Sequence, residues 1–426
     1  MAMQTILVNL LLALPVLTAA AQPRKRCIVP ASGSNQTDDA PAIRQAFQDC
    51  AHDAKVVFQP TTYYINSVLN ISGLEDVDID IHGHLLWSTD IPYWLSSSLP
   101  VGYQNQSTAF ILSGNNIRLN GHGVGTLNGN GDYWYEWISK QPNTSNYPGR
   151  PHQITFSGLT NSVVKGLNFL RSQMWTMSII HSRDSVWEDI FVNNTGNRVS
   201  SSNTDGADTF FSSNLLFRNW TVYNSDDSFS AKANSTNITL LDSHFYHGLG
   251  IAIGSIGQYN NAFETISNFR AENVYFENTL HAFYVKTWTD DQVGFPPNGG
   301  GGGLGYAENL HLKDLKVKGA RGGLFTISQC TRFSGAPGVG NCTNSQFQVR
   351  DVVIDGLRGT TKDRRVVSLQ CSAVAPCTDI ELRDVDVRFS GNGSVVEGYL
   401  CGNVVDNDGF NCTGPACVGG SATGGC

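Results

Sequence analysis

The chain has 426 residues, of which 40% are hydrophobic and 15% are charged, so it is long enough to bury a large core and is not disordered. The formal net charge of -8 and the pI near 5.6 leave no broad basic surface, which argues against nucleic acid or an anionic membrane as a partner. A polyanionic substrate would therefore have to meet a few individually placed cations.

The first 21 residues have the pattern of a secretory signal peptide. An apolar stretch from Ile6 to Leu17 is followed by three alanines at 19–21, which fits signal-peptidase cleavage near Gln22. A membrane anchor is the weaker interpretation, because the apolar run is shorter than the ~20 residues that span a bilayer. We therefore expect a secreted, extracellular protein whose mature domain comprises residues 22–426.

Residues 37–50 (TDDAPAIRQAFQDC) predict a short helix. Thr37 or Asp38 would be its N-cap, Pro41 lies in the first turn, and Ile43 and Phe47 share one face. No other segment shows a convincing helical period.

The cysteines of an exported chain favour disulfides over free thiols or metal ligands. Spacing predicts the local pairs Cys27–Cys50, Cys330–Cys342 and Cys371–Cys377. The sequence does not pair the last four, which are Cys401, Cys412, Cys417 and Cys426. N-glycosylation sequons fit an exported glycoprotein, for example at Asn70, Asn143, Asn219, Asn234, Asn237, Asn341 and Asn392.

One phrase of alternating apolar and polar residues, ended by Asn, Asp or Gly, recurs through the chain. It reads NSVVKGLNF at 161, DSVWEDIFV at 184, NLLFRNWTV at 214, NITLLDSHF at 237, NLHLKDLKV at 309 and DIELRDVDV at 379. The first intervals are 184 minus 161, or 23; 214 minus 184, or 30; and 237 minus 214, or 23. Short strands repeated at this spacing predict a solenoid, here a parallel β-helix, whereas a β-sandwich or propeller fits the spacing less well.

The predicted architecture gives the first helix and the turn residues a role. A helix attached by Cys27–Cys50 would cover the open end of the solenoid, where an edge strand is otherwise exposed. The many Asn and Gly residues suit the left-handed backbone of tight corners. We expect one domain with no linker, capped at the other end by the cysteine-rich tail.

Two acidic motifs lie about one coil apart. NTDGADTF (203–210) holds Asp205 and SDDSF (225–229) holds Asp226 and Asp227, and 226 minus 205 is 21. Residues one coil apart are stacked neighbours at the ~4.8 Å strand spacing, so the three carboxylates should share one patch. Crowding would raise at least one pKa, and a protonated carboxyl beside an ionised one is what glycoside hydrolysis needs. A calcium site and a row of solvated turns are the competing interpretations.

Several motifs resemble, in order, those of family 28 glycoside hydrolases, the polygalacturonases and rhamnogalacturonases. They are LNGNGDYWYEW (127–137), NTDGADTF, SDDSF, GLGIAIGSIG (248–257) and YVKTW (284–288). The resemblance implies a right-handed parallel β-helix and single-displacement, inverting hydrolysis without a metal or other cofactor. By motif, Asp226 would be the general acid, Asp205 and Asp227 would hold and activate the water, and Asn203 would support them.

The chain departs from the family pattern at two positions. The usual His is Leu249, and His247 could take its place if side chains alternate along an extended strand. The usual R-I-K is Tyr284-Val285-Lys286, so one of two cations for uronate carboxylates is missing and Lys286 is expected to meet one carboxylate. Tyr284 and Leu249 would suit a methyl group and a sugar face.

These departures favour a substrate with a neutral terminal sugar followed by a uronate. The pattern most resembles the exo-acting fungal branch that includes rhamnogalacturonan α-L-rhamnosidases and exo-polygalacturonases. Exo action would need a blocked cleft, which the long aromatic segments 87–106 and 132–152 could provide. Trp134, Trp137 and Trp288 could stack on sugars or be buried, and the glycine run 299–303 is expected to be a flexible loop.

The leading hypothesis is therefore a monomeric, inverting enzyme that releases terminal α-L-rhamnose from pectic rhamnogalacturonan. An exo-polygalacturonase that releases galacturonate is the nearest alternative. A calcium-dependent pectate lyase and a non-catalytic carbohydrate-binding β-helix stay open, although no Arg lies near the acidic motifs to serve a lyase as base.

Overall fold

The computed structural model describes residues 24–142, 146–291, 300–331 and 342–419. The predicted signal peptide, Cys426 and the sequons at Asn143 and Asn341 lie outside these residues. Within the described chain, none of the helices is long and apolar enough to cross a membrane.

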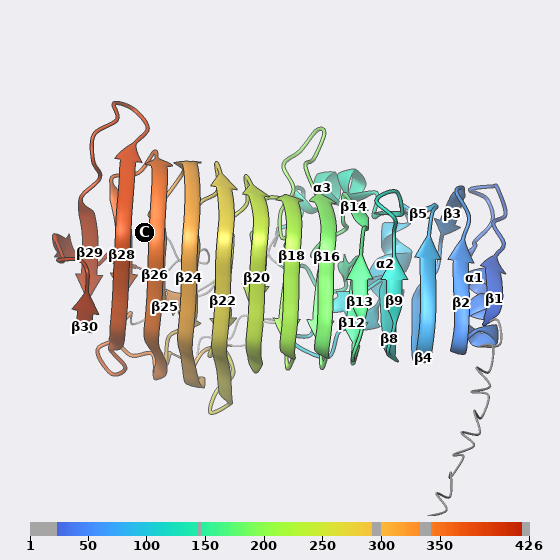
Figure 1. The fold of residues 1–426 in the computed structure, drawn as a ribbon, viewed down its shortest axis with the longest axis horizontal. Coiled ribbons are helices and arrows are strands. Elements are labelled where there is room, and N and C mark those ends of the chain that lie inside the picture. The colour runs from blue at the N-terminus through green and yellow to red at the C-terminus, as the bar shows by residue number, and fades with distance from the viewer. Residues whose placement is uncertain (1–23, 143–145, 292–299, 332–341, 420–426) are drawn as a thin grey trace, which may run out of the picture.

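Parallel strands stacked coil upon coil along one axis form almost the whole molecule (Figure 1). One ladder of long strands comprises β16 (Arg183–Asn193), β18 (Ser213–Tyr223), β20 (Ser235–Tyr246), β22 (Phe263–Glu277), β24 (Leu304–Ala320), β26 (Phe347–Thr361), β28 (Cys377–Phe389) and β30 (Val404–Asp408). A second ladder of shorter strands comprises β12 (Ile154–Ser157), β15 (Met177–Ile180), β17 (Ala207–Phe210), β19 (Asp227–Ala231), β21 (Gly250–Ile256), β23 (Phe283–Trp288), β25 (Phe325–Thr331), β27 (Arg365–Gln370), β29 (Gly398–Gly402) and β31 (Gly414–Pro415).

The N-terminal coils are built from shorter pieces of the same sheet. They are β1 (Lys25–Val29), β2 (His52–Phe58), β3 (Thr62–Ile65), β4 (Leu69–Ile81), β5 (His84–Trp87), β8 (Phe110–Asn115), β9 (Arg118–Asn120), β10 (Thr126–Asn128), β13 (Val163–Lys165) and β14 (Asn168–Leu170). A separate small sheet holds β6 (Leu99–Pro100), β7 (Ser107–Thr108) and β11 (Pro151–His152).

The strand register reproduces the intervals of the sequence repeat. Val163 pairs with Val186, Val186 with Leu216, and Leu216 with Thr239. These steps are 186 minus 163, or 23; 216 minus 186, or 30; and 239 minus 216, or 23. The predicted parallel β-helix is confirmed, and the sandwich and propeller alternatives are wrong.

The repeated Asn and Asp residues form ladders at left-handed corners. Asp184, Asn214 and Asn237 have φ values of 53°, 56° and 53°. Asn214 Nδ2 donates to Asp184 Oδ1 at 2.8 Å, and Asn237 Nδ2 donates to Asn214 Oδ1 at 2.9 Å. Asn and Asp tolerate this backbone and bond locally, which explains why each phrase begins with one of them.

The inside of the solenoid is a continuous apolar column. Trp187 and Phe217 from successive coils stack with ring centroids 5.4 Å apart, and both side chains are fully buried. Because burying one large apolar side chain contributes about 1.5–3 kcal/mol, the column is the main stabilising term of the fold.

The first helix, α1 (Ala40–Asp49), lies beside β1 at the N-terminal end of the solenoid (Figure 1). It buries Ile43 and Phe47 as predicted, but the N-cap is Asp39, not Thr37 or Asp38. The Asp39 carboxylate accepts hydrogen bonds from the backbone N–H groups of Ser32 and Tyr64, at 2.8 Å each. The start of the helix is therefore set by hydrogen bonds from Asp39 to residues outside the helix. The sequence around the helix does not reveal these tertiary contacts.

Two further helices were not expected. They are α2 (Ile91–Ser97) and α3 (Gly131–Ile138), and each lies in one of the two long aromatic segments. Asp90 caps α2 by accepting from the Tyr93 N–H at 3.1 Å. Helices this short carry fewer than three turns of apolar period, so the sequence pattern did not indicate them.

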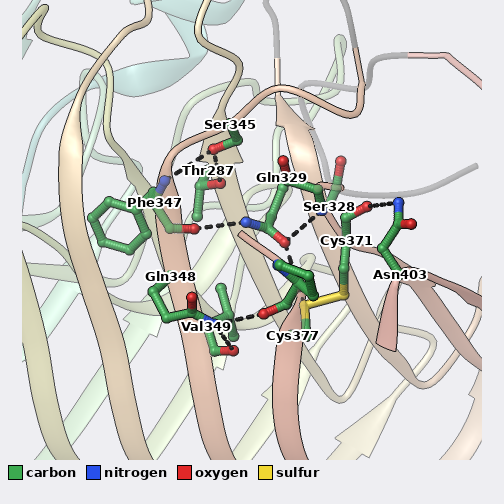
Figure 2. Close-up of a disulfide and its surroundings, with 12 residues drawn as sticks. Thr287, Ser328, Gln329, Ser345, Phe347, Gln348, Val349, Cys371, Cys377 and Asn403 are labelled. Atoms are coloured by element: carbon green, nitrogen blue, oxygen red, sulfur yellow. Dashed lines mark hydrogen bonds between the residues drawn. A yellow bond between two sulfur atoms is a disulfide. The ribbon is translucent and has the colours of Figure 1, made fainter. Parts of the chain in front are cut away.

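All three predicted disulfides are present, and Cys401–Cys412 is a fourth. Cys417 is also disulfide-bonded. Figure 2 shows Cys371–Cys377 beside the buried Gln329, whose Nε2 donates to the Phe347 carbonyl at 2.6 Å, while Asn403 Nδ2 donates to the Cys371 carbonyl at 2.9 Å. The disulfide thus closes the connection between β27 and β28, beside the hydrogen-bonded side chains of Gln329 and Asn403.

The described part of the glycine run is ordered, which corrects the expectation of a flexible loop; Gly299 itself lies outside the described residues. Gly302 and Gly303 donate their N–H groups to the carbonyls of Thr289 and Gly257, at 2.9 and 3.0 Å. A Cβ on Gly303 would lie 2.4 Å from the Gly257 carbonyl carbon, so only glycine allows this approach.

Candidate functional site

Asp205, Asp226 and Asp227 come together in the structure, with one carboxylate oxygen of each within 4.8 Å of the others. Asp205 lies just before β17, and Asp227 is the first residue of β19 on the next coil. The Gly206 N–H donates to the Asp227 carbonyl at 2.9 Å, which fixes the two strand starts side by side. The expectation that a one-coil interval would stack these acids is confirmed.

The three carboxyls differ in environment. Asp205 and Asp227 are 3% and 1% exposed, whereas Asp226 is only partly buried. Burial first, and then the neighbouring Asp226, raises the pKa of Asp205 well above its usual value. Burial, with the negative charge of Asp227, raises the pKa of Asp226 to about 6. The most accessible carboxyl is therefore one that holds a proton in mildly acidic solution.

Asn203 lies next to Asp226, as predicted. Its Nδ2 donates to Asp226 Oδ2 at 3.4 Å, and its Oδ1 accepts from the Asn146 N–H at 3.2 Å. The Asp227 N–H donates to the other oxygen, Asp226 Oδ1, at 2.9 Å. Both oxygens of Asp226 are thus oriented by neutral donors.

Tyr284 and Lys286 reach the cluster from β23, two coils beyond β19. The Tyr284 hydroxyl donates to Asp227 Oδ1, and Lys286 Nζ donates to Asp227 Oδ2 at 3.1 Å. Tyr284 is fully buried, and only 9% of the Lys286 side chain is exposed. Both side chains therefore bind Asp227, and their expected contacts with a substrate carboxylate and a sugar face stay predictions.

His247 does not join the carboxylates. It is exposed at the turn after β20, with φ of 67°, and its Nδ1 lies 3.0 Å from Asn278 Nδ2. The expected alternation fails because His247 and Gly248 form a turn and not an extended strand. Leu249 packs against Ala252 and Tyr284 and is 8% exposed, so it supports the Tyr284 ring.

A buried histidine, His281, was missed by the sequence reasoning. Its ring lies 4.9 Å from the Tyr284 ring, and its Nδ1–H donates to the Gly323 carbonyl at 2.6 Å. It directly precedes the apolar residues of β23, where nothing in the local pattern marks it as part of the site.

A second missed feature is a buried ion pair beside Asp205. Lys232 Nζ lies 3.4 Å from Asp208 Oδ1 and 5.1 Å from the centre of the Trp175 ring. Burial raises the pKa of Asp208 to about 7, with Lys232 opposing the shift. Asp208 on β17 pairs in register with Ser230, and Lys232 lies two residues after Ser230, just beyond the end of β19. Strand alternation from Asp208 was therefore the signal that could have found this pair.

The arrangement does not suit calcium. Lys286 and Tyr284 already occupy both oxygens of Asp227, and the raised pKa values of Asp205 and Asp226 favour protonated carboxyls over the ionised set that calcium requires. Another group of potential ligands, Asp80, His82 and His122, lies elsewhere in the N-terminal coils.

The two aromatic segments contribute α2, nearly all of α3, and the strands β6 and β11, which both pair with β7. Trp134 is fully buried, and Trp288 is 3% exposed, so neither presents a face to solvent. Trp137 is partly buried, between Trp134 and Tyr147, with ring centroids 6.0 and 4.9 Å away. Of the two expected alternatives, burial therefore holds for Trp134 and Trp288.

Comparisons with known proteins place the chain in a family. The model of glycosyl hydrolases family 28 matches residues 66–407. Over 404 residues the chain is 56% identical to the alpha-L-rhamnosidase rgxB of Aspergillus niger, covering 95% of this chain and 93% of that protein. It is 30% identical to an exopolygalacturonase of Cochliobolus carbonum, covering 89% and 84%. The structure of an endo-xylogalacturonan hydrolase from Aspergillus tubingensis superposes with a TM-score of 0.75 at 24% identity, covering 92% of this chain and all of that one.

The structural likeness supports a right-handed parallel β-helix, as the motifs implied. The family match spans most of the chain and includes all three carboxylates of the cluster. The chain therefore belongs to the glycosyl hydrolases of family 28 and is a glycoside hydrolase.

Proposed function

We propose that the protein is an exo-acting α-L-rhamnosidase that removes terminal rhamnose from rhamnogalacturonan. The observation that carries this proposal is the 56% identity to an alpha-L-rhamnosidase along nearly the whole chain, against 30% for an exopolygalacturonase. The site is consistent with it, because Tyr284 replaces a cation and Lys286 is neutralised by Asp227. The described residues of the cluster thus offer no uncommitted cation to a uronate in the released-sugar position.

In this proposal Asp226 is the general acid. Its pKa of about 6 keeps a proton available for the glycosidic oxygen, and it is the most exposed of the three carboxyls. Asn203 and the Asp227 N–H orient its two oxygens. As the C–O bond breaks, the proton passes to the leaving oxygen and Asp226 is left ionised.

Asp205 and Asp227 would hold the attacking water, and Asp227, the carboxylate paired with Lys286, would accept its proton. Their side chains are almost fully buried, and both oxygens of Asp227 are engaged by Tyr284 and Lys286. A water molecule reaches such oxygens more easily than the anomeric carbon of a sugar does, so single displacement with inversion is favoured.

Retention is the competing outcome, and one observation favours it. Carboxyl groups about 5 Å apart usually mark double displacement, whereas inverting pairs stand roughly 6.5–9.5 Å apart. The nearest oxygens of this cluster lie within 4.8 Å. The distance rule applies to sites with two carboxyl groups, whereas this site has three. The stereochemistry of the product therefore decides between inversion and retention.

Product analysis tests the substrate. Purified protein should release free rhamnose from rhamnogalacturonan oligosaccharides that end in rhamnose, and Asp226→Asn should slow the release by about 100-fold or more. Galacturonate released from oligogalacturonides, without rhamnose from the first substrate, would replace this proposal with exo-polygalacturonase. Unsaturated products that vanish with chelator would indicate a lyase, and binding without turnover would indicate a non-catalytic protein.

We also propose that residues 1–21 are removed as a signal peptide and that 22–426 form one secreted, monomeric domain. Four described disulfides support an extracellular location. Amino-terminal sequencing of protein from the culture medium checks the cleavage, and light scattering checks the monomer.

A further inference from the structure

A polar pocket of about 520 Å³ lies beside the strand turn that carries Asp226. One wall is the loop 195–201, which follows β16, and the others are turns after β18, β20, β22 and β24. This loop rises beyond the ends of β16 and β18, near α3 (Figure 1). The pocket residues used below are Asn197, Arg198, Ser225, His247, Asn278 and Arg321.

The ionisable groups that line the pocket are all basic. Arg198, His247 and Arg321 line it, and no carboxylate is among its described lining residues, although the whole chain has a net charge of -8. Amides and hydroxyls make up most of the remaining lining. Such a surface suits an anionic sugar, because guanidinium groups pair with carboxylates and amides and hydroxyls bond sugar hydroxyls.

The acidic residues near the pocket neutralise little of the positive charge of its lining. Glu136 on α3 is 3.9 Å from Arg198, a long separation between exposed side chains, and it pairs more closely with Lys140 at 2.9 Å. Glu277, near His247, is bound by Lys318 at 2.9 Å. Asp132 accepts from the Asn197 amide.

Arg321 is positioned without a carboxylate partner among the described residues. Its Nη2 donates to the carbonyls of His247 and Gly248, at 2.7 and 2.9 Å. These bonds hold the guanidinium at the pocket, and Arg321 has no salt bridge within the described chain. Because its acceptors are neutral, Arg321 keeps its positive charge available to pair with an anionic ligand.

The pocket is next to the general acid. Ser225 lines it and precedes Asp226, and the Leu249 N–H, one residue beyond the Arg321-bound Gly248, donates to the Asp226 carbonyl at 2.8 Å. The general acid lies beside the glycosidic oxygen that it protonates. The rest of the polymer keeps this oxygen after cleavage, so a pocket beside the general acid can contact that polymer.

We propose that this pocket is a uronate subsite, in which Arg198 and Arg321 bind the carboxylate of a galacturonate residue in the polymer that keeps the leaving oxygen. The assignment rests on the proposed function. It moves carboxylate recognition from Lys286, which Asp227 neutralises, to a separate basic pocket.

The test compares a charged substrate with a neutral one. Rhamnose release is measured on rhamnogalacturonan oligosaccharides and on the same oligosaccharides with their carboxyls reduced to alcohols, for the wild-type protein, Arg198→Met, Arg321→Met and Arg321→Lys. Losing a charge-assisted hydrogen bond should raise KM on the charged substrate about tenfold relative to the reduced one, with kcat nearly constant. Arg321→Lys should recover part of the loss.

Arg383→Met is the matched control, because Arg383 is an exposed arginine on β28 that pairs with Glu381. It should leave the ratio of the two KM values at the wild-type value. Arg198 has an 83% exposed side chain, so its variant keeps the fold even if Arg321→Met is destabilised.

An unchanged KM ratio in Arg198→Met and Arg321→Met, or an equal rise on both substrates, overturns the subsite while rhamnose release still stands. If the wild-type protein releases no rhamnose, the proposed function fails. Calorimetric titration of Asp226→Asn with oligogalacturonides then tests separately whether the pocket binds a uronate. Binding weakened about tenfold by Arg198→Met then supports the uronate subsite, and unchanged binding overturns it.

Discussion

Lys286 places its Nζ 3.1 Å from Oδ2 of Asp227, although 59 residues separate them in the chain. The contact spans two coils, from β23 to β19, and is almost wholly buried. A buried charge without its partner is costly, so the site and the local stability of the solenoid depend on the same ion pair.

Replacing this lysine tests that dependence. Lys286→Met should lower the free energy of unfolding by about 3–5 kcal/mol, because Asp227 is left buried and unpaired. Glycosidase activity should fall as well. Chemical denaturation measures the first effect, and Lys318→Met, which breaks the exposed pair with Glu277, should cost only about 0–1 kcal/mol. Similar losses in the two variants would contradict a special role for the buried pair.

The acid role of Asp226 predicts the direction of the pH dependence. A carboxyl with a pKa raised to about 6 is protonated below that pH, so kcat should fall as the pH rises through about 6. Asp226→Asn should lower kcat by about 100-fold to 10000-fold and remove this alkaline limb. A rate profile that rises through pH 6, or a limb kept in Asp226→Asn, would assign the acid to another group.

The buried Asp208 predicts how stability varies with pH. Its pKa is raised to about 7, so the folded protein binds this proton more tightly than the unfolded chain does. This contribution is complete below the unfolded pKa, near 4, and is lost as the pH rises through about 7. The free energy of unfolding should therefore fall between pH 4 and pH 8, and Asp208→Asn should flatten the curve. Equal slopes in the two proteins would show that Asp208 does not titrate in this range.

Stereochemistry separates the two mechanisms. Inversion of an α-linkage predicts β-L-rhamnose as the first product, and proton NMR in the first minutes, before mutarotation, detects the anomer. First appearance of the α-anomer would establish retention and make one of the buried carboxylates a nucleophile. The same experiment on Asp208→Asn is the control, since that residue is not assigned to bond breaking.

Much of the site was predictable because a β-helix turns sequence intervals into neighbours. A spacing of one coil predicted that Asp205 would lie beside Asp226 and Asp227, and the structure confirms it. The short spacings of Cys371–Cys377 and Cys330–Cys342 predicted their bonds in the same way. In each case the two residues in contact are either one repeat apart or close in the sequence, so their spacing along the chain is enough to predict the contact.

Other contacts were not predictable from intervals. His247 was expected at the cluster from strand alternation, but a turn of positive φ sends it to the surface. The pairing of Lys286 with Asp227, two coils away, has no signature in the sequence intervals. The helices α2 and α3 are too short for a clear period.

The solenoid and the stacking of its carboxylates follow from the sequence, because the spacing of apolar strands and Asn corners specifies the coils. The distribution of charge around the carboxylates appears only in the folded chain: Lys286 and Tyr284 contact Asp227, Lys232 pairs with Asp208, and Arg198 and Arg321 line a pocket beside Asp226. Backbone stacking follows the order of the chain, whereas the partner of a buried charge depends on which side chains from other coils reach it once water is excluded.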